Sequence, residues 1–215
     1  MIAIDGPAGA GKSTVARALA VNIGFDYLDT GALYRAAALK LVQAGLNEGA
    51  DDDLLSSVLR RTLIEFKNGV VFLDGKDVSE EIRTPEAGHY SSVFSARKPV
   101  RDYLLEIQRN AGGTNGSSGI VAEGRDMATV VFPDALKKFY ITADEHTRAQ
   151  RRHAQLSEKN PDVTRENARL DIAARDERDT TRAIAPLTRA ADAIEIDTTN
   201  LSIEETILKM LKECL

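Results

Sequence analysis

The chain has 215 residues, of which 43% are hydrophobic and 28% charged, a balance typical of a globular domain with a sizeable buried core. Its net charge of −5 argues against non-specific binding to nucleic acid, and its single cysteine, Cys214, excludes an internal disulfide framework and fits a reducing compartment. No apolar run approaches the roughly 18 residues of a membrane span, and a glycine-rich motif begins too early to leave room for a signal peptide. We therefore expect a cytoplasmic protein that binds neither membranes nor nucleic acid.

The N-terminal stretch predicts a buried strand, "MIAID", followed by a phosphate-binding loop. The loop follows the pattern Gly-x-x-x-x-Gly-Lys-Ser, whose glycines let backbone N–H groups point inward and whose lysine reaches the β- and γ-phosphates. The Ser13 hydroxyl is placed to ligate Mg²⁺. A plain glycine-rich turn is the alternative, but the strand before the loop and the helical run after it are the context that the motif requires. The nucleoside-triphosphate site is expected at Gly6, Pro7, Ala8, Gly9, Ala10, Gly11, Lys12, Ser13 and Thr14.

Helical patterns and short apolar runs then alternate along the chain. Helices are expected from the loop to about Asn22 with Gly24 as the stop, and over "ALYRAAALKLVQAG", "KPVRDYLLEIQRN", "EHTRAQRRHAQL" and the C-terminal segment. Capping boxes are expected at Thr142 with Glu145 and at Ser202 with Glu205. Strands are expected in "FDYLDTG", "IVAEGRD", "KKFYITAD" and "AIEID". The alternation predicts an α/β fold with a parallel sheet flanked by helices.

Three stretches depart from this alternation. Residues 63–78, "LIEFKNGVVFLDGKDV", alternate apolar and polar side chains between turn signals, which indicates a small antiparallel meander. Residues 111–119, "AGGTNGSSG", are of low complexity and are expected to form a flexible surface loop. The arginine-rich residues from about 157 to 182 predict a helical flap that has no obvious apolar anchor and is mobile without ligand.

The flap region has an unusual choice of cation. Eight of the nine basic residues from Arg148 to Arg182 are arginines, the residue suited to bidentate phosphate recognition. A solvated helical face with i,i+4 ion pairs is the alternative interpretation. Arg35 and Arg125 follow other predicted elements and would point toward the same carboxyl end of the sheet, where ligands bind in open α/β folds.

Six stretches that span nearly the whole chain resemble, in order, the signatures of bacterial-type cytidylate kinase: "IDGPAGAGKST", "LDTGALYRAAAL", "DGKDVSEEIRT", "VAEGRDMATVVFPDA", "RDERDTTRAIAPL" and "DTTNLSIEETI". The resemblance implies a P-loop kinase that moves the γ-phosphoryl group of ATP to CMP or dCMP with Mg²⁺, as a monomer. It also implies a single kinase domain, 1–215, with a core at 1–35, 119–148 and 183–215. A monophosphate-binding region would span about 36–118 with a β insertion near 63–85, and a lid would span about 149–182.

The same resemblance implies roles for individual residues. The CMP phosphate would be held by Arg35, Arg125 and Arg182, and the cytosine read by Ser92, Arg101 and Asp126. Arg175 and Asp179 would meet the ribose, Thr30 keeps a hydroxyl of the family pattern, and Arg148 and Arg152 would close over the transferring group. The implied catalytic set is Lys12, Arg125, Arg148, Arg152 and Arg182.

Some of these assignments have alternatives. Glu123 stands where the family commonly has aspartate, so base or ribose contacts are not assigned to it. Asp126 and Asp179 could instead be helix caps or ion-pair partners, and Ser92 a plain surface residue. A nucleotide-switch protein is disfavoured, because the Asn-Lys-x-Asp and Asp-x-x-Gly patterns are absent from the sequence. A kinase for a phosphate-free acceptor would not require three arginines together.

Overall fold

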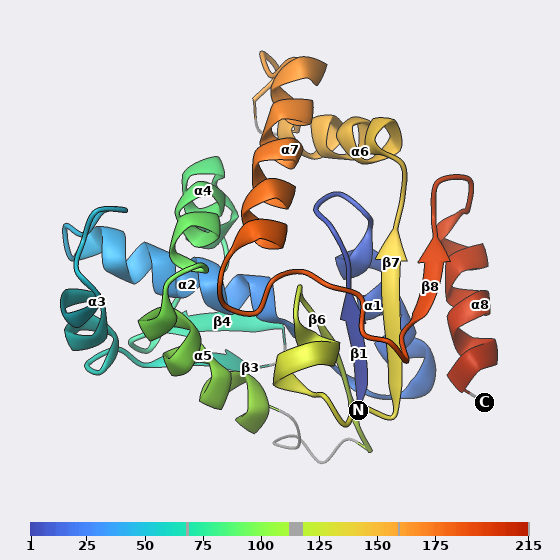
Figure 1. The fold of residues 1–215 in the computed structure, drawn as a ribbon, viewed down its shortest axis with the longest axis horizontal. Coiled ribbons are helices and arrows are strands. Elements are labelled where there is room, and N and C mark those ends of the chain that lie inside the picture. The colour runs from blue at the N-terminus through green and yellow to red at the C-terminus, as the bar shows by residue number, and fades with distance from the viewer. Residues whose placement is uncertain (68, 112–117, 159, 215) are drawn as a thin grey trace.

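A computed structural model of the chain describes residues 1–67, 69–111, 118–158 and 160–214. The elements of the first half are β1 (Ile2–Asp5), α1 (Lys12–Ile23), β2 (Asp26–Asp29), α2 (Thr30–Gln43), α3 (Asp52–Leu59), β3 (Ile64–Lys67), β4 (Val70–Leu73), β5 (Lys76–Asp77), the 3₁₀ turn η1 (Glu81–Arg83), α4 (Pro85–Phe94) and α5 (Lys98–Asn110). The second half contains β6 (Ile120–Glu123), the π-helical turn η2 (Met127–Val131), β7 (Lys137–Thr142), α6 (Glu145–Ser157), α7 (Arg165–Thr181), β8 (Ile194–Asp197) and α8 (Ile203–Cys214). Figure 1 shows their arrangement.

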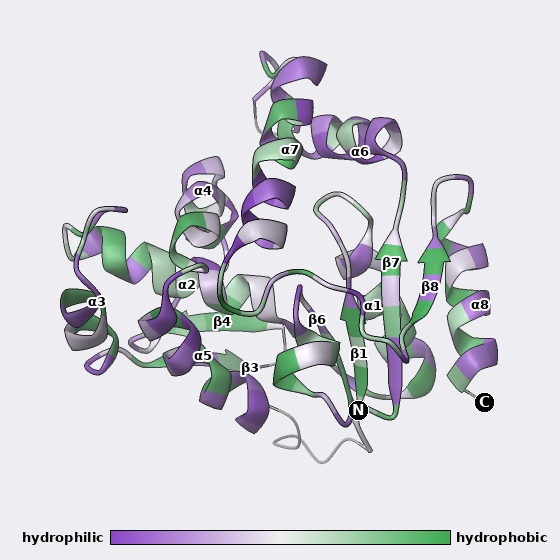
Figure 2. Ribbon diagram, in the orientation of Figure 1, coloured by the Kyte–Doolittle hydropathy of each residue, from purple (hydrophilic) through white to green (hydrophobic). Residues whose placement is uncertain are grey.

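The central sheet has five parallel strands in the order β2-β6-β1-β7-β8, which confirms the predicted fold class. Alternate residues of β1 face opposite layers, because successive side chains of a strand point to opposite faces. Ile2 and Ile4 pack in the cluster that includes α1 and α8, whereas Ala3 packs in the cluster that includes α2 and the small sheet. In Figure 2, β1 is mainly green and the lower turns of α7 are purple to white. The carboxyl ends of the parallel strands therefore share one edge of a buried sheet.

Most of the expected elements are present. The meander is confirmed as an antiparallel sheet with the order β3-β4-β5. The capping box of α8 is confirmed, since the Glu205 amide donates to Ser202 Oγ at 3.1 Å and the Ser202 amide to Glu205 Oε2 at 2.8 Å. Helices α3 and α4 and the turn η2 were not predicted. Most of the low-complexity stretch, residues 112–117, lies outside the described residues.

The predicted cap of α6 is wrong. Thr142 is the last residue of β7, and the side chain of Asp144 caps the helix by accepting from the Thr147 amide at 2.6 Å. An aspartate next to the first helical residue reaches the free N–H groups of the first turn, whereas Thr142 is occupied in the strand.

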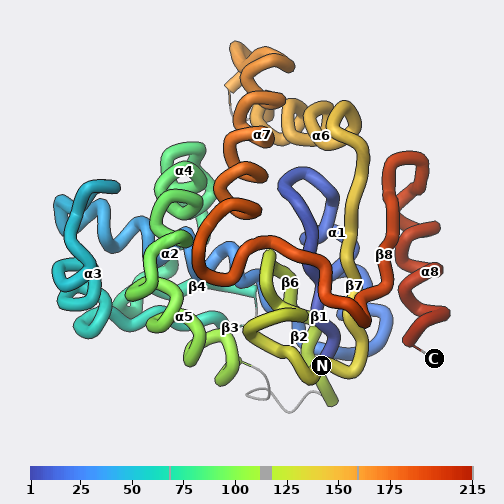
Figure 3. Tube along the Cα trace, viewed as in Figure 1, coloured from blue at the N-terminus to red at the C-terminus, as the bar shows by residue number. Residues whose placement is uncertain are grey.

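The expectation that the flap has no apolar anchor is also wrong. Ile172 and Ala168, on α7, are only 1% and 0% exposed. A Cβ at Gly9 would lie 3.1 Å from the Ile172 side chain, so α7 rests directly on the glycine-rich loop. The Ala8 amide donates to Asp176 Oδ1 at 3.0 Å, and the tube in Figure 3 follows α6 and α7 across the top of this loop.

The anchor gives a first prediction. Ile172→Ala is expected to loosen α7 from the loop, because truncating a buried isoleucine costs about 2–5 kcal/mol. Local opening that becomes easier by about 2 kcal/mol speeds amide hydrogen exchange by about 30-fold. The increase should be confined to α6 and α7, as measured by exchange mass spectrometry. Leu170→Ala, on the same helix but at a residue that is 50% exposed, is the matched control. Equal exchange in α7 of both variants and the parent would contradict this anchor.

Candidate active site

The glycine-rich loop leaves the end of β1 and passes close to β7. Gly6 has a φ of +149°, and a Cβ there would lie 1.9 Å from the Ile141 carbonyl oxygen, so only glycine fits. The loop ends at Gly11 and Lys12 opens α1, which directs helix N–H groups into the loop. Lys12 Nζ donates to the Pro7 carbonyl at 2.7 Å, inside the loop itself. The loop thus has the shape of an anion-binding site, and the Lys12 ammonium occupies its centre.

Burial shifts the protonation of this lysine. Desolvation, followed by repulsion from Arg125, lowers the pKa of Lys12 to about 7, while Glu123, Asp179 and Asp5 oppose the shift. A phosphate group placed in the loop would favour the charged form, because an opposite charge at short range stabilises the ammonium.

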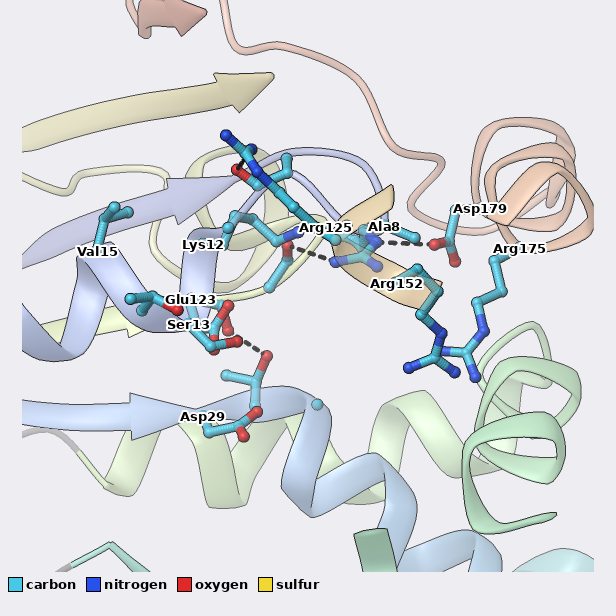
Figure 4. A pocket seen from close by; sticks show the side chains of 18 of the residues that line it. Ala8, Lys12, Ser13, Val15, Asp29, Glu123, Arg125, Arg152, Arg175 and Asp179 are labelled. Atoms are coloured by element: carbon cyan, nitrogen blue, oxygen red, sulfur yellow. Dashed lines mark hydrogen bonds and ion pairs between the residues drawn. The ribbon is translucent and has the colours of Figure 1, made fainter. Parts of the chain in front are cut away.

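A cavity of about 450 Å³ extends from the loop along the edge of the sheet. Its walls come from the loop, from the segments after β2 and β6, and from α4, α5, α6 and α7 (Figure 4). The predicted site residues that line it are Ala8, Gly9, Ala10, Gly11, Lys12, Ser13, Thr14, Thr30, Arg35, Ser92, Arg101, Arg125, Asp126, Arg152, Arg175, Asp179 and Arg182. Gly6, Pro7 and Arg148 are not among the lining residues. The fold therefore brings together parts of the chain that lie far apart in sequence.

Each predicted phosphate-binding arginine has a carboxylate beside it. Arg35 pairs with Asp29 at 3.1 Å, and Asp179 pairs with Arg125 at 2.8 Å and with Arg182 at 3.6 Å. Arg182 Nη2 is buried and has no hydrogen-bond partner among the described residues. Arg182 itself lines the cavity, where its guanidinium could pair with an anionic ligand.

The arginines of α6 and α7 occupy different places. Arg152 and Arg175 lie side by side in Figure 4 and share Asp171, at 2.7 and 3.2 Å. Arg148 lies behind the loop, where it pairs with Asp176 and donates to the Ala8 carbonyl at 3.0 Å.

Arg151 lines the cavity although it was not predicted. Its guanidinium donates to Thr198 Oγ1 at 2.9 Å and to the Thr198 carbonyl at 2.8 Å. The run Arg151-Arg152 could have indicated it, since the residue next to a lid arginine on one helix can also face the loop.

Two of the three expected base-reading residues, Arg101 and Asp126, form a buried pair in the cavity wall. Asp126 and Arg101, 2% and 7% exposed, pair with each other, and Arg101 Nη1 also donates to the Ser95 carbonyl at 3.0 Å. The Arg101 guanidinium lies over the Tyr34 ring, 5.6 Å from its centroid. Ser92 Oγ accepts from Arg178 Nε at 2.9 Å. Fixed donors and acceptors in a dry corner can discriminate between ligands by hydrogen bonding.

Glu123 is a buried acidic residue that lines the cavity together with the loop. Its carboxylate accepts from the Tyr27 hydroxyl at 2.7 Å and its carbonyl from Thr30 Oγ1 at 2.6 Å. Burial raises the pKa of Glu123, and a hydrogen bond with the Ser13 hydroxyl opposes the shift. The described residues include no cluster of three or more His, Cys, Asp or Glu side chains that could hold a metal ion alone. Ser13 and Glu123 could complete the shell of a hydrated Mg²⁺ that is also bound by phosphate oxygens.

Comparisons with known proteins agree with one another. A family model described as cytidylate kinase matches residues 2–214. The chain is 49% identical to a cytidylate kinase of Thermosipho melanesiensis over 98% of this chain and 94% of that protein. It is 46% identical to a cytidylate kinase of Fervidobacterium nodosum, with the same coverage. A solved uncharacterized protein from Eubacterium ventriosum has a TM-score of 0.51 at 14% identity, covering 99% of this chain and 96% of that one, which supports the fold alone. None of the helices in the described part of the chain has the length and apolar character needed to cross a bilayer.

The lowered pKa of Lys12 gives a second prediction. Because the free protein loses this proton near pH 7 and a bound phosphate requires the charged amine, ATP binding at higher pH must take up a proton. The ATP dissociation constant should therefore rise by up to about tenfold per pH unit above pH 7. Titration calorimetry between about pH 7.5 and 9, in buffers of different ionisation enthalpy, measures the uptake, because the terminal phosphate is already ionised there. Lys12→Met should bind more weakly and take up no proton. Equal proton uptake by the parent and by Lys12→Met would contradict the assignment.

Proposed function

The chain belongs to the cytidylate kinase family and transfers the γ-phosphoryl group of ATP to CMP or dCMP, and we propose how its cavity residues divide this work. In the reaction, the bond from the γ-phosphorus to its bridging oxygen breaks and a bond to a CMP phosphate oxygen forms, which gives ADP and CDP or dCDP. One observation carries the proposal: a single cavity is lined both by the glycine-rich loop and by Arg35, Arg125 and Arg182. Two phosphate-bearing ligands can therefore meet there.

The phosphates would be divided between the two groups of cations. The loop amides from Gly9 to Thr14 and Lys12 would hold the β- and γ-phosphates of ATP. Arg35, Arg125 and Arg182 would hold the phosphate of CMP, replacing part of their contact with carboxylates. Because phosphoryl transfer needs positioning and charge stabilisation more than covalent chemistry, this arrangement supplies most of what the reaction requires.

The transferring group would lie between these two sets. Arg152 is our first candidate to contact it, with Arg151 as the second, since both line the cavity. Arg148 would have to leave Asp176 and the Ala8 carbonyl before it could touch a phosphate, so we propose that it acts by holding the lid on the loop.

The nucleoside of CMP would extend toward α4 and α5. Arg101 and Asp126, with Ser92, would read the cytosine, and Arg175 and Asp179 would contact the ribose. Thr30 would support the turn after β2 through its bond to the Glu123 carbonyl.

Mg²⁺ would be held by Ser13 Oγ, with Glu123 close to its shell. The ion, when bound, neutralises phosphate charge and aligns the phosphate chain. Ser13 and Glu123 would keep their places because the Tyr27 hydroxyl holds the carboxylate at 2.7 Å.

The remaining proposals concern organisation. We propose that residues about 36–118 close around CMP and about 149–182 close over ATP, against the core at 1–35, 119–148 and 183–215. We also propose that the chain works as a monomer in the cytoplasm, because one chain supplies a complete cavity and its single cysteine suits a reducing compartment.

The reaction itself is tested with a panel of acceptors. ADP formation should be fast with CMP and dCMP, slower with UMP, and at background level with nucleosides or shikimate. Lys12→Ala should abolish transfer while leaving the circular dichroism spectrum unchanged, because the charge acts only on bound phosphates. Normal turnover by a folded Lys12→Ala protein would refute the assignment of the loop.

Base selection gives a further prediction. A carboxylate at position 126 accepts from the amine of cytosine but opposes the carbonyl oxygen of uracil, whereas an asparagine amide can donate to that oxygen. Because an unpaired buried polar group costs about 1–3 kcal/mol, Asp126→Asn should compress the CMP-over-UMP ratio of kcat/KM by about 10- to 100-fold. Asparagine is chosen over alanine because it leaves a hydrogen-bond acceptor beside buried Arg101. Arg182→Ala is the matched control, which should weaken both substrates about equally. An unchanged ratio in Asp126→Asn would place base reading elsewhere.

A further inference from the structure

Asp5 is a buried carboxylate that none of the roles above uses. It is the last residue of β1 and directly precedes Gly6, the first residue of the phosphate-binding loop. Its side chain leaves the residue only 1% exposed. Oδ1 accepts from the Met127 amide and Oδ2 from the Ala128 amide, both at 2.8 Å. Each carboxylate oxygen therefore has its own backbone donor.

The two amides belong to the start of η2, whose first N–H groups have no partner within the turn. Asp5 thus caps a turn that begins more than a hundred residues later in the chain, after the neighbouring strand β6. An asparagine at position 5 would offer one acceptor in place of two and would set an N–H₂ group against an N–H group. Only an ionised carboxylate of this length satisfies both amides.

The carboxylate is retained despite an unfavourable environment. Burial raises the pKa of Asp5 to about 6, and the charge of Asp126 also raises it, while the two amides and Lys12 oppose the shift. Burying this carboxylate costs desolvation energy that an apolar residue would avoid. Stabilising the fold is therefore a poor explanation for an acid at this position. Its geometry points to positioning instead.

The segment that Asp5 holds contains Arg125 and Asp126, the proposed contacts of the acceptor phosphate and of the base. Gly124 donates its amide to the Ile4 carbonyl at 2.9 Å, so the turn is tied to β1 on that side. On the other side Asp5 holds Met127 and Ala128. Arg125 and Asp126 lie between these two ties, and the Asp126 carbonyl is held by the Val130 amide at 2.9 Å. The final two residues of β1 thus fix the backbone that presents both side chains.

We propose that Asp5 is a positioning residue that sets the Arg125–Asp126 turn at a fixed place relative to the phosphate-binding loop, and so aligns the acceptor nucleotide with ATP. The inference rests on the proposed roles of Arg125 and Asp126. Asp5 adjoins Gly6, the first residue of the loop. A shift of the turn that Asp5 holds would therefore move the acceptor site relative to the loop and leave the loop amides in place.

The test is Asp5→Asn in the full chain. KM for CMP should rise by about tenfold or more, and the CMP-over-UMP ratio of kcat/KM should fall. The ATP dissociation constant should rise less than KM for CMP, and only because the charge of Asp5 also helps to keep Lys12 protonated. Ile2→Val is the matched control, since Ile2 is buried on the same strand at 3% exposure and holds no turn. It should lower Tm without changing either KM or the ratio.

Combining variants separates positioning from a general loss of stability. If Asp5 acts through Asp126, then Asp5→Asn should compress the ratio much less in an Asp126→Asn background than in the parent. Asp5→Glu, which keeps the charge but displaces the amides, should show the same loss of selectivity if Asp5→Asn does not fold. An unchanged KM for CMP in a folded Asp5 variant, or equal effects of Asp5→Asn and Ile2→Val at equal Tm, would overturn the inference. A parent enzyme without preference for CMP would instead overturn the proposed function.

Discussion

The cavity must hold several positive charges close together before any phosphate is present, and carboxylates make this possible. Asp179 lies between Arg125 and Arg182, Asp126 pairs with Arg101, and Asp171 pairs with two lid arginines. Without these partners, repulsion in a partly dry cavity would push the arginines apart, because like charges interact strongly at low dielectric. The carboxylates also fix the guanidinium groups in place, so that a phosphate meets donors that are already oriented.

One helix connects most of this arrangement. Residues 168, 172, 175 and 179 of α7 follow helical spacing and present one face, which begins apolar against the loop and ends charged in the cavity. Asp176 and Arg178 extend this contact to both sides, toward the Ala8 amide and Ser92. A movement of α7 would therefore change the covering of the loop and the positions of Arg175 and Asp179 together. Under the proposed roles of the cavity residues, this helix would couple the binding of the two nucleotides.

Local chemistry explains what could be predicted from the sequence. The loop spacing, the helix stops and the strand alternation depend on near neighbours, and the structure contains them where expected. The order of the strands and the pairing of Arg148 with Asp176 depend on contacts between distant segments, which no local pattern specifies. Ile172 and Ala168 were missed as an anchor because two apolar residues one turn apart, in an otherwise mainly polar helix, give no clear periodic signal. The cap at Asp144 was missed because Thr142 matched the spacing of a capping box two residues too early. The roles of the site residues come from the resemblance and stay predictions.

The end of β1 explains why so much buried charge is kept at this edge of the sheet. Lys12, Glu123, Asp5 and Asp126 are all under 9% exposed, and burial is the first cause of the pKa shifts of the first three. Apolar residues there would favour folding, since desolvating charges is expensive. They could not, however, accept hydrogen bonds from the Met127 and Ala128 amides, as Asp5 does. A parallel sheet places all of its strand ends side by side, so a single short strand can carry the loop through Gly6 and the acceptor turn through Asp5. Under the proposed roles, this strand would be the fixed element that sets the loop and the acceptor turn relative to each other, and the buried charge of Asp5 is part of that arrangement.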